Sequence, residues 1–338
     1  MRQPLAGQTA TGVQYVADCE NVDIDGIELR TITDADTAAL AVADETADRL
    51  RAVFDAFRGR PIVLLSGGVD SILVAATAAT LGTRPHAITV VTDVDTDDYG
   101  PASAAAQALG LTHEVIYLTQ DEVVDLAERT TRILGTAELY EVAAAIPLVA
   151  ARNAIAAHAA QQDEAVALLT GSGADAIFAG GRFVTAPIDS PSATAELDAF
   201  VRAEVCANFV RHRLVPDYYE RVLGDFADNL VHVFQTERFW QIGRTLAPPA
   251  LFRNVDGTVR DKMPLRIACS NTLPSGAASL AWTRKSPIQR STGVLGALTQ
   301  AARASAACLP GAGTYSDPLT EPIENVAVRL YLHHVARS

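Results

Sequence analysis

Short apolar runs alternate with stretches of helical spacing through the first half of the chain. Runs without a helical period predict buried strands over residues 61–65, 85–92, 113–118 and 165–169. Apolar residues at helical spacing predict helices over residues 33–57, 70–79, 103–109, 121–134 and 139–160. This order is typical of an α/β fold with a doubly wound parallel sheet, in which ligands bind at the carboxyl ends of the strands.

The pattern changes on either side of this stretch. Residues 1 to about 35 are polar, with short alternating pieces that could form a small hairpin. From Ser190 onward the spacing is mainly helical, and helices are predicted over residues 194–211, 216–234 and 294–307. We therefore expect an N-terminal polar segment with a lead-in helix (residues 1–58), an α/β core (59–190) and a mainly helical C-terminal part (191–338).

Composition narrows the class of protein. Of 338 residues, 49% are apolar, which is ample for a full core, and the net charge is −13. This charge argues against a broad surface for nucleic acid or anionic membranes and favours small-molecule substrates. Four scattered cysteines, with no signal-peptide core or uninterrupted apolar run of membrane-spanning length, indicate a reducing cytoplasm.

A glycine-containing loop follows the first predicted strand. Between that strand and an alanine-rich helix the chain runs Ser66-Gly67-Gly68-Val69-Asp70-Ser71. Such a turn points backbone N–H groups and a helix N-terminus at one spot, which suits a phosphate chain. Bare phosphate would repel Asp70, so we expect this carboxylate to hold a magnesium ion that bridges the phosphates. The alternative is an ordinary turn in which Ser and Asp cap the helix.

The six residues of this loop carry a family resemblance. The loop has neither the Gly-x-x-x-x-Gly-Lys-Ser/Thr pattern of kinases and GTPases nor a Gly-x-Gly-x-x-Gly dinucleotide pattern. It resembles the signature of the ATP pyrophosphatase family, whose members cleave ATP between the α and β phosphates. The resemblance implies that ATP binds here.

A second glycine-rich loop follows the fourth predicted strand. The run Thr170-Gly171-Ser172-Gly173-Ala174-Asp175 resembles the second signature of the asparagine synthetase and β-lactam synthetase group. The resemblance implies that Gly171 and Gly173 line the nucleotide and that Asp175 is the second magnesium-binding aspartate. The alternative for Asp175 is a helix cap.

A third match lies near the C-terminus. Leu265-Arg266, Leu273-Pro274 and the run from Leu280 to Lys285 are similar to that group's Leu-Arg, Leu-Pro and tryptophan-arginine-lysine stretches. The resemblance implies that Lys285 is the active-site lysine, where a cation would stabilise charge on the departing pyrophosphate. It also implies a role in the pocket for Arg266. The alternative for Lys285 is a solvated surface lysine.

These resemblances together imply a reaction. A small-molecule carboxylic acid would attack the α-phosphate of ATP, with Mg²⁺, to give an acyl-adenylate and pyrophosphate. A nitrogen nucleophile would then displace AMP and form an amide. The implied enzyme is an AMP-forming carbon–nitrogen ligase.

The chain departs from the group at the position of its general base. Asparagine synthetases have glutamate and β-lactam-forming relatives tyrosine where this chain has Ser172, and a serine hydroxyl is a weak base. Glu237 is offset from the group's second conserved glutamate. Three explanations stay open: a nucleophile that is already unprotonated, transfer of the adenylate to a partner protein, or another base. Candidates for that base are His113, His212 and His232.

A second departure concerns the source of nitrogen. Glutamine-hydrolysing relatives begin with a cysteine and a glutaminase domain, whereas residue 2 here is Arg2 and the segment before the first loop is short. We expect free ammonia, a substrate amine or a partner subunit to supply nitrogen. The expected assembly is a homodimer or a complex with a partner protein that supplies nitrogen. The alternative functions are an ATP-binding sensor or scaffold subunit without turnover, and a tRNA-modifying ATP pyrophosphatase.

Overall fold

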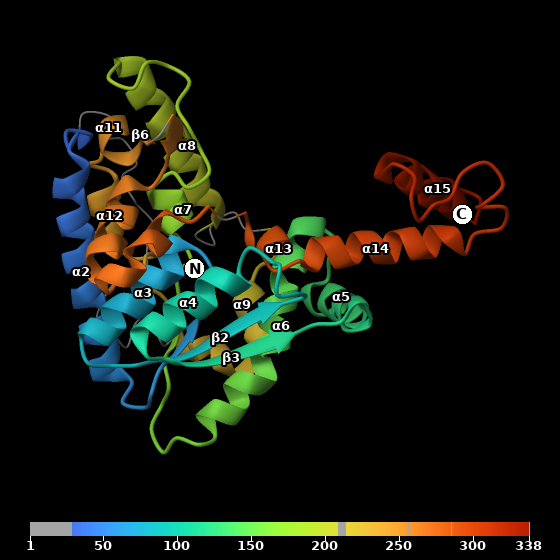
Figure 1. Cartoon of the computed structure of the whole chain (residues 1–338), viewed down its shortest axis with the longest axis horizontal. Coiled ribbons are helices and arrows are strands. Elements are labelled where there is room, and N and C mark those ends of the chain that lie inside the picture. The colour runs from blue at the N-terminus through green and yellow to red at the C-terminus, as the bar shows by residue number, and fades with distance from the viewer. Residues whose placement is uncertain (1–28, 209–213, 256, 285, 338) are drawn as a thin grey trace.

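The computed structural model describes residues 29–208, 214–255, 257–284 and 286–337. Most of the predicted N-terminal hairpin lies outside the described residues. Five parallel strands form the central sheet in the order β3-β2-β1-β4-β5 (Figure 1). They are β1 (Ile62–Leu64), β2 (His86–Val91), β3 (Thr112–Tyr117), β4 (Leu168–Thr170) and β5 (Leu230–His232). The predicted α/β fold with a doubly wound parallel sheet is confirmed.

Helices cover both faces of this sheet because successive strand residues point to opposite sides. In β1, Val63 belongs to one buried apolar cluster, whereas Ile62 and Leu64 pack in the other. The first cluster includes residues of α2 (Ala35–Ala56), α3 (Val69–Thr80), α4 (Tyr99–Leu109) and α12 (Met263–Thr272). The second includes residues of α5 (Gln120–Leu134), α6 (Leu139–Ala159) and α9 (Tyr218–Leu223).

The remaining elements complete the described chain. The helices are α7 (Ala174–Ile177), α8 (Pro191–Asn208), α10 (Glu237–Gly243), α11 (Pro248–Leu251), α13 (Ile288–Ser291), α14 (Val294–Ala307) and α15 (Ile323–Val335), with 3₁₀ turns η3 (Gly224–Asn229) and η4 (Ser275–Trp282). Strands β6 (Arg253–Val255) and β7 (Thr258–Arg260) form an antiparallel hairpin. Helix α14 extends from the body and carries α15 at its far end (Figure 1).

The predicted helix over residues 216–234 is wrong. Helix α9 ends at Leu223, and its C-cap Gly224 has φ 59° and ψ −130°, a conformation that side chains other than glycine rarely tolerate. The chain then forms η3 and the edge strand β5, whose Leu230 pairs with Leu168 of β4. A strand from the predicted C-terminal part thus extends the sheet of the predicted core.

Helix α6 is the described helix whose length and composition would allow it to cross a membrane, with a mean hydropathy of 1.4 in its most apolar window. Half of that window is buried inside the protein. Residues such as Ile146, Val149 and Ile155 pack in the second cluster. These contacts are those of a core helix.

The order of the strands places two loops together. The chain moves outward from β1 through β2 to β3 and then returns to add β4 on the other side of β1. The carboxyl ends of β1 and β4 therefore flank a topological switch point, where open α/β sheets bind their ligands. The two glycine loops predicted to bind nucleotide follow these two strands.

Candidate functional site

The first glycine loop is held by its own serines. The hydroxyls of Ser66 and Ser71 lie 2.9 Å apart, and the Ser66 amide donates to Ser71 Oγ at 3.0 Å. Helix α3 begins at Val69, and its N-cap, Gly68, provides no side-chain cap. The first amides of α3 therefore have no side-chain cap, an arrangement that suits an anion.

Asp98, which lies outside the first glycine loop in sequence, binds that loop through a hydrogen bond. Its Oδ1 accepts a hydrogen bond from the Gly67 amide at 2.8 Å, and its Oδ2 accepts one from Ser291 Oγ at 2.8 Å. The sequence motifs did not single out Asp98. Asp93, Asp95 and Asp97 of the same segment are exposed, whereas Asp98 is buried.

The second loop lies directly against the first. A Cβ at position 171 would lie 2.7 Å from the Ser71 backbone nitrogen and 2.8 Å from Asp70 Cβ. Gly173 has φ 97°, which favours glycine, and it precedes the short helix α7 that carries Asp175. The two loops, about a hundred residues apart in sequence, therefore form one site.

Asp70 and Asp175 converge on one cation, the ammonium of Lys262. Lys262 Nζ lies 2.7 Å from Asp70 Oδ2 and 2.5 Å from Asp175 Oδ1. The two oxygens can be no farther apart than the sum of these distances. Burial alone would lower the pKa of the ammonium, but the charges of Asp175 and Asp70 outweigh burial and raise this pKa above its usual range.

The aspartate pair fits a magnesium ion. Mg²⁺ prefers oxygen ligands and is commonly held by one or two carboxylates together with substrate phosphates. Asp70 and Asp175 supply two carboxylates at one point, beside the N-terminus of α3. The sequence motifs predicted this pair of aspartates but gave no indication of Lys262, which lies between them.

Ser172 lies at this edge of the sheet, and its hydroxyl accepts a hydrogen bond. Its Oγ accepts a hydrogen bond from Gln235 Nε2 at 3.1 Å, and its amide donates to Thr170 Oγ1 at 3.3 Å. Thr170 Oγ1 also lies 2.8 Å from His232 Nδ1. Because Gln235 already donates to the Ser172 oxygen, the hydroxyl proton can be directed toward a ligand.

The other candidate bases lie in different surroundings. His113 is near the start of β3, at the amino end of the sheet, where its Nε2 lies 2.8 Å from Thr89 Oγ1. His212 lies outside the described residues. Glu237 is in α10, with its Oε1 3.4 Å from Gln241 Nε2. Of the three histidines, His232 is the one that the structure describes beside the second loop.

Arg266 is engaged by the protein itself. Its guanidinium donates to the backbone oxygens of Asp261 at 2.9 Å and Ala281 at 2.9 Å, and to Asp261 Oδ1 at 3.0 Å. Arg266 therefore fastens the start of α12 to the segment that leads to Lys285. Lys285 lies outside the described residues.

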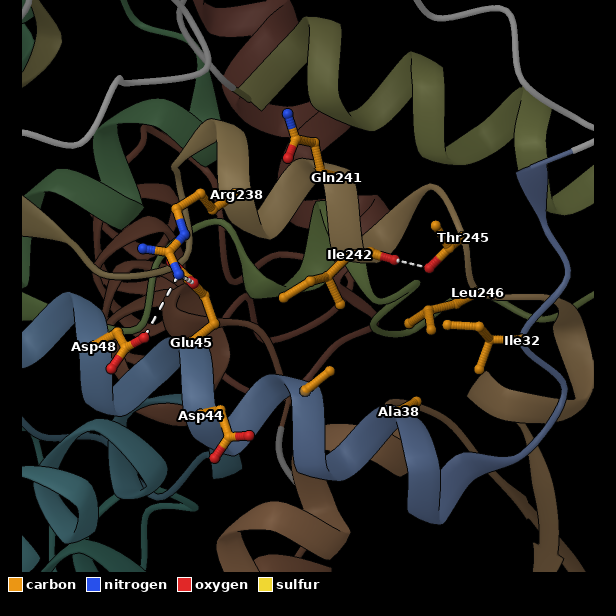
Figure 2. A pocket seen from close by; sticks show the side chains of 11 residues that line it. Ile32, Ala38, Asp44, Glu45, Asp48, Arg238, Gln241, Ile242, Thr245 and Leu246 are labelled. Carbon is orange, nitrogen blue, oxygen red and sulfur yellow. Dashed lines mark hydrogen bonds and ion pairs between the residues drawn. The ribbon is translucent and has the colours of Figure 1, made fainter.

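A separate pocket of about 410 Å³ lies between α2 and α10 (Figure 2). Figure 2 shows Arg238 of α10 reaching toward Glu45 and Asp48 of α2, with Arg238 Nη2 2.8 Å from Glu45 Oε2. None of the residues that line this pocket belongs to either glycine loop. This pocket is therefore separate from the two glycine loops.

A family model described as "Asparagine synthase" matches residues 57–243, more than half of the chain and both glycine loops. The chain belongs to the asparagine synthase family. Membership supports, as the general kind of enzyme, an ATP-dependent ligase that forms carbon–nitrogen bonds. No curated protein matches this family member.

Two solved structures resemble this asparagine synthase family member weakly. An NH3-dependent NAD synthetase from Campylobacter jejuni, in complex with nitrate ion, is 17% identical with a TM-score of 0.31. That match covers 43% of this chain and 62% of the other, less than two thirds of its length. An NAD+ synthetase from Burkholderia pseudomallei is 14% identical with a TM-score of 0.28, covering 91% and 99% of the two chains. The fold is established by the strand order instead.

Proposed function

We propose that this protein is an ATP-dependent, AMP-forming ligase that adenylates a small carboxylic acid and joins it to a nitrogen nucleophile. The observation that carries this proposal is the convergence of Asp70 and Asp175 beside the uncapped N-terminus of α3. Backbone amides and a paired carboxylate site are what a metal-bound triphosphate requires.

The residues of the two loops have distinct roles in this proposal. Ser66, Gly67, Gly68, Val69 and Ser71 surround the phosphates, and Gly171 and Gly173 let the second loop approach. Asp70 and Asp175 would hold Mg²⁺, which when bound neutralises phosphate charge and assists departure of pyrophosphate.

The carboxylate oxygen of the acid attacks the α-phosphorus of ATP, and the bond to the β-phosphate oxygen breaks. Lys285 would stabilise negative charge on the departing pyrophosphate and on the following tetrahedral intermediate. Arg266, whose guanidinium binds Asp261 and Ala281, would hold the segment before Lys285 in place.

The proposed class of nitrogen nucleophile rests on the hydrogen bonding of Ser172. Its oxygen accepts a hydrogen bond from Gln235, which leaves the hydroxyl to donate to the substrate. We propose a nucleophile that is unprotonated near neutral pH, such as a hydroxylamine, a hydrazine or an amine of low pKa. The protein would act in the cytoplasm, with nitrogen from ammonia, a substrate amine or a partner subunit.

ATP–pyrophosphate exchange tests adenylation directly. A panel of carboxylic acids is screened with ³²P-pyrophosphate for exchange that depends on both acid and Mg²⁺. Asp70→Asn should abolish exchange, whereas Asp95→Asn, which removes an exposed carboxylate from a neighbouring loop, should retain it. Absence of acid-dependent exchange with folded, ATP-binding protein would count against the ligase.

A second candidate is a nucleotide-sensing subunit without turnover. The presence of Ser172, hydrogen-bonded to Gln235, where relatives have a base favours this alternative. It predicts ATP binding with no release of AMP or pyrophosphate for any acid and amine. Single-turnover analysis of nucleotide products by chromatography separates the two candidates.

A further inference from the structure

The ammonium of Lys262 lies where a metal ion shared by Asp70 and Asp175 would lie. Lys262 Nζ is 3.0 Å and 2.7 Å from the two carboxylate oxygens of Asp70, and 2.5 Å from Asp175 Oδ1. A magnesium ion bound by both carboxylates would use these same oxygens. The lysine and a free metal ion therefore compete for one pair of ligands.

The backbone conformation of Lys262 and the glycine at position 180 allow the ammonium to lie between the two carboxylates. Lys262 has φ 51° and ψ 35°, a left-handed conformation that persists in non-glycine residues where surrounding contacts enforce it. Gly180 makes room for the ion pair, because a Cβ there would overlap both Asp175 Oδ1 and Lys262 Cε. The lysine thus lies in a space fitted to it.

Asp261, the residue before Lys262, holds this part of the backbone through two hydrogen bonds. Asp261 Oδ2 accepts a hydrogen bond from the Gly181 amide at 2.6 Å, and Oδ1 accepts one from Arg266 Nη2 at 3.0 Å. Gly181 belongs to the segment that follows α7, and Arg266 belongs to α12. Asp261, next to Lys262, is therefore fixed between the segment that follows α7 and helix α12.

The two carboxylates differ in their access to solvent. The side chain of Lys262 is 8% exposed and that of Asp70 18%, whereas that of Asp175 is 72% exposed. A metal ion arriving from solvent would meet Asp175 first. To bind both aspartates it must displace a buried ammonium from its partners, which is unfavourable unless another anion receives the ammonium.

We propose that Lys262 is a built-in counter-cation, which holds Asp70 and Asp175 together and excludes a free divalent cation until the metal arrives with a nucleotide. This proposal rests on the proposed function, because it takes the aspartate pair to be the metal site of ATP. The triphosphate supplies the additional negative charge that can accept the displaced ammonium.

Binding of Mn²⁺ without nucleotide tests the proposal, with the signal of free Mn²⁺ followed by electron paramagnetic resonance. Wild-type protein should bind Mn²⁺ weakly at this site. Lys262→Met removes the charge while keeping a long side chain, and should bind Mn²⁺ at least about tenfold more tightly. Lys262→Arg keeps the charge and should stay close to wild type.

Two further measurements assign the effect to this site. Addition of Asp70→Asn to Lys262→Met should abolish the gain, and with a non-hydrolysable α,β-methylene ATP the wild type should bind more Mn²⁺ than the nucleotide binds in the absence of protein. Wild type that binds Mn²⁺ as tightly as Lys262→Met, without nucleotide, would overturn the proposal. Should Lys262→Met not fold, Lys262→Gln replaces it, and tight metal binding by wild type alone would equally overturn the proposal.

The outcome is separate from that of the proposed function. Loss of nucleotide binding or of pyrophosphate exchange in wild type would remove the ligase assignment. The Mn²⁺ comparison without nucleotide would still show whether Lys262 guards the aspartate pair. Conversely, equal Mn²⁺ affinities with active exchange would reject the counter-cation and retain the ligase.

Discussion

Gly171 packs so closely on Ser71 that a Cβ at position 171 would lie 2.7 Å from the Ser71 backbone nitrogen. Backbone cannot give way as a flexible side chain can, so an alanine here must separate the two loops. We expect Gly171→Ala to cost about 1–3 kcal/mol of stability and to weaken ATP binding about tenfold or more.

Equilibrium binding of a fluorescent ATP analogue and urea unfolding measure these two effects. Gly276→Ala is the matched control, because the Cβ that it would add meets nothing within 4 Å beyond its own chain neighbours and local helix backbone. ATP affinity in Gly171→Ala equal to that of the control would show that the loops need not touch.

Asp98 orients the first loop through two hydrogen bonds, one to the Gly67 amide and one to Ser291 Oγ. Hydrogen bonds to a buried charged group contribute about 1.5–3 kcal/mol each. Asp98→Ala should therefore lower the free energy of unfolding by about 2 kcal/mol or more and should weaken ATP binding.

The direction of the binding change distinguishes two roles of Asp98. Removal of a negative charge near a triphosphate would by itself strengthen binding, so weaker binding shows that loop orientation dominates. Titration with the ATP analogue measures the change, with Asp95→Ala, at an exposed position, as the control. Stronger binding in Asp98→Ala would contradict the positioning role.

The sequence patterns predicted the sheet and both loops because they are local. An apolar run, two glycines and an alanine-rich helix around Asp70 determine a strand, a turn and a helix N-terminus within a few residues. The order of strands and helices then brings Asp175 to the same edge of the sheet. The pairing of the two aspartates at a metal also rested on the resemblance of the second loop to the asparagine synthetase and β-lactam synthetase group.

Lys262 was missed because its position depends on contacts distant in sequence. It lies 192 residues from Asp70, after the β6–β7 hairpin, in a segment with no helical or strand period. The one local signal is Pro264, which indicates a helix start shortly after a lysine. The sequence pattern also failed to predict strand β5. Its apolar run is no longer than one helical turn, so it was included in the predicted helix over residues 216–234.

Glu45 gives a pH dependence of stability. Its carboxyl is buried, and its Oε1 finds no hydrogen-bond partner among the described residues although Oε2 pairs with Arg238. Burial raises its pKa above the ordinary value of 4.5, against the opposing effect of Arg238. The folded state thus binds a proton more tightly than the unfolded state, so this carboxyl stabilises the fold at low pH and less as pH rises.

Glu45→Gln should remove that dependence. Relative to the variant, wild type should lose unfolding free energy as pH rises from about 4.5 through the raised pKa. Urea unfolding at pH 5 and pH 7.5 measures the difference, with Asp48→Asn as a control at the exposed carboxylate near the same arginine. If wild type instead gains stability over this pH range relative to Glu45→Gln, the pKa of Glu45 is lowered by folding and not raised.

Cys269 and Cys308 should differ in their reactivity. Cys269 is buried in α12, and burial, with the nearby charge of Asp70, raises its pKa to about 12 despite Arg266. Cys308 is exposed. Because the thiolate is the reactive form, iodoacetamide at pH 8 should label Cys308 quickly and Cys269 only when α12 separates from the core. Mass spectrometry of each cysteine peptide measures both rates.

The labelling of Cys269 also reports on the segment that carries Lys262. Helix α12 packs against α2 and α3 and begins directly after Lys262, so opening of α12 would withdraw the ammonium from the aspartates. Arg266→Lys loses the guanidinium contacts that fasten the start of α12, and it should speed labelling of Cys269 without changing that of Cys308. If Cys269 in folded wild type is labelled as fast as Cys308, the contacts of Arg266 do not keep α12 packed on the core.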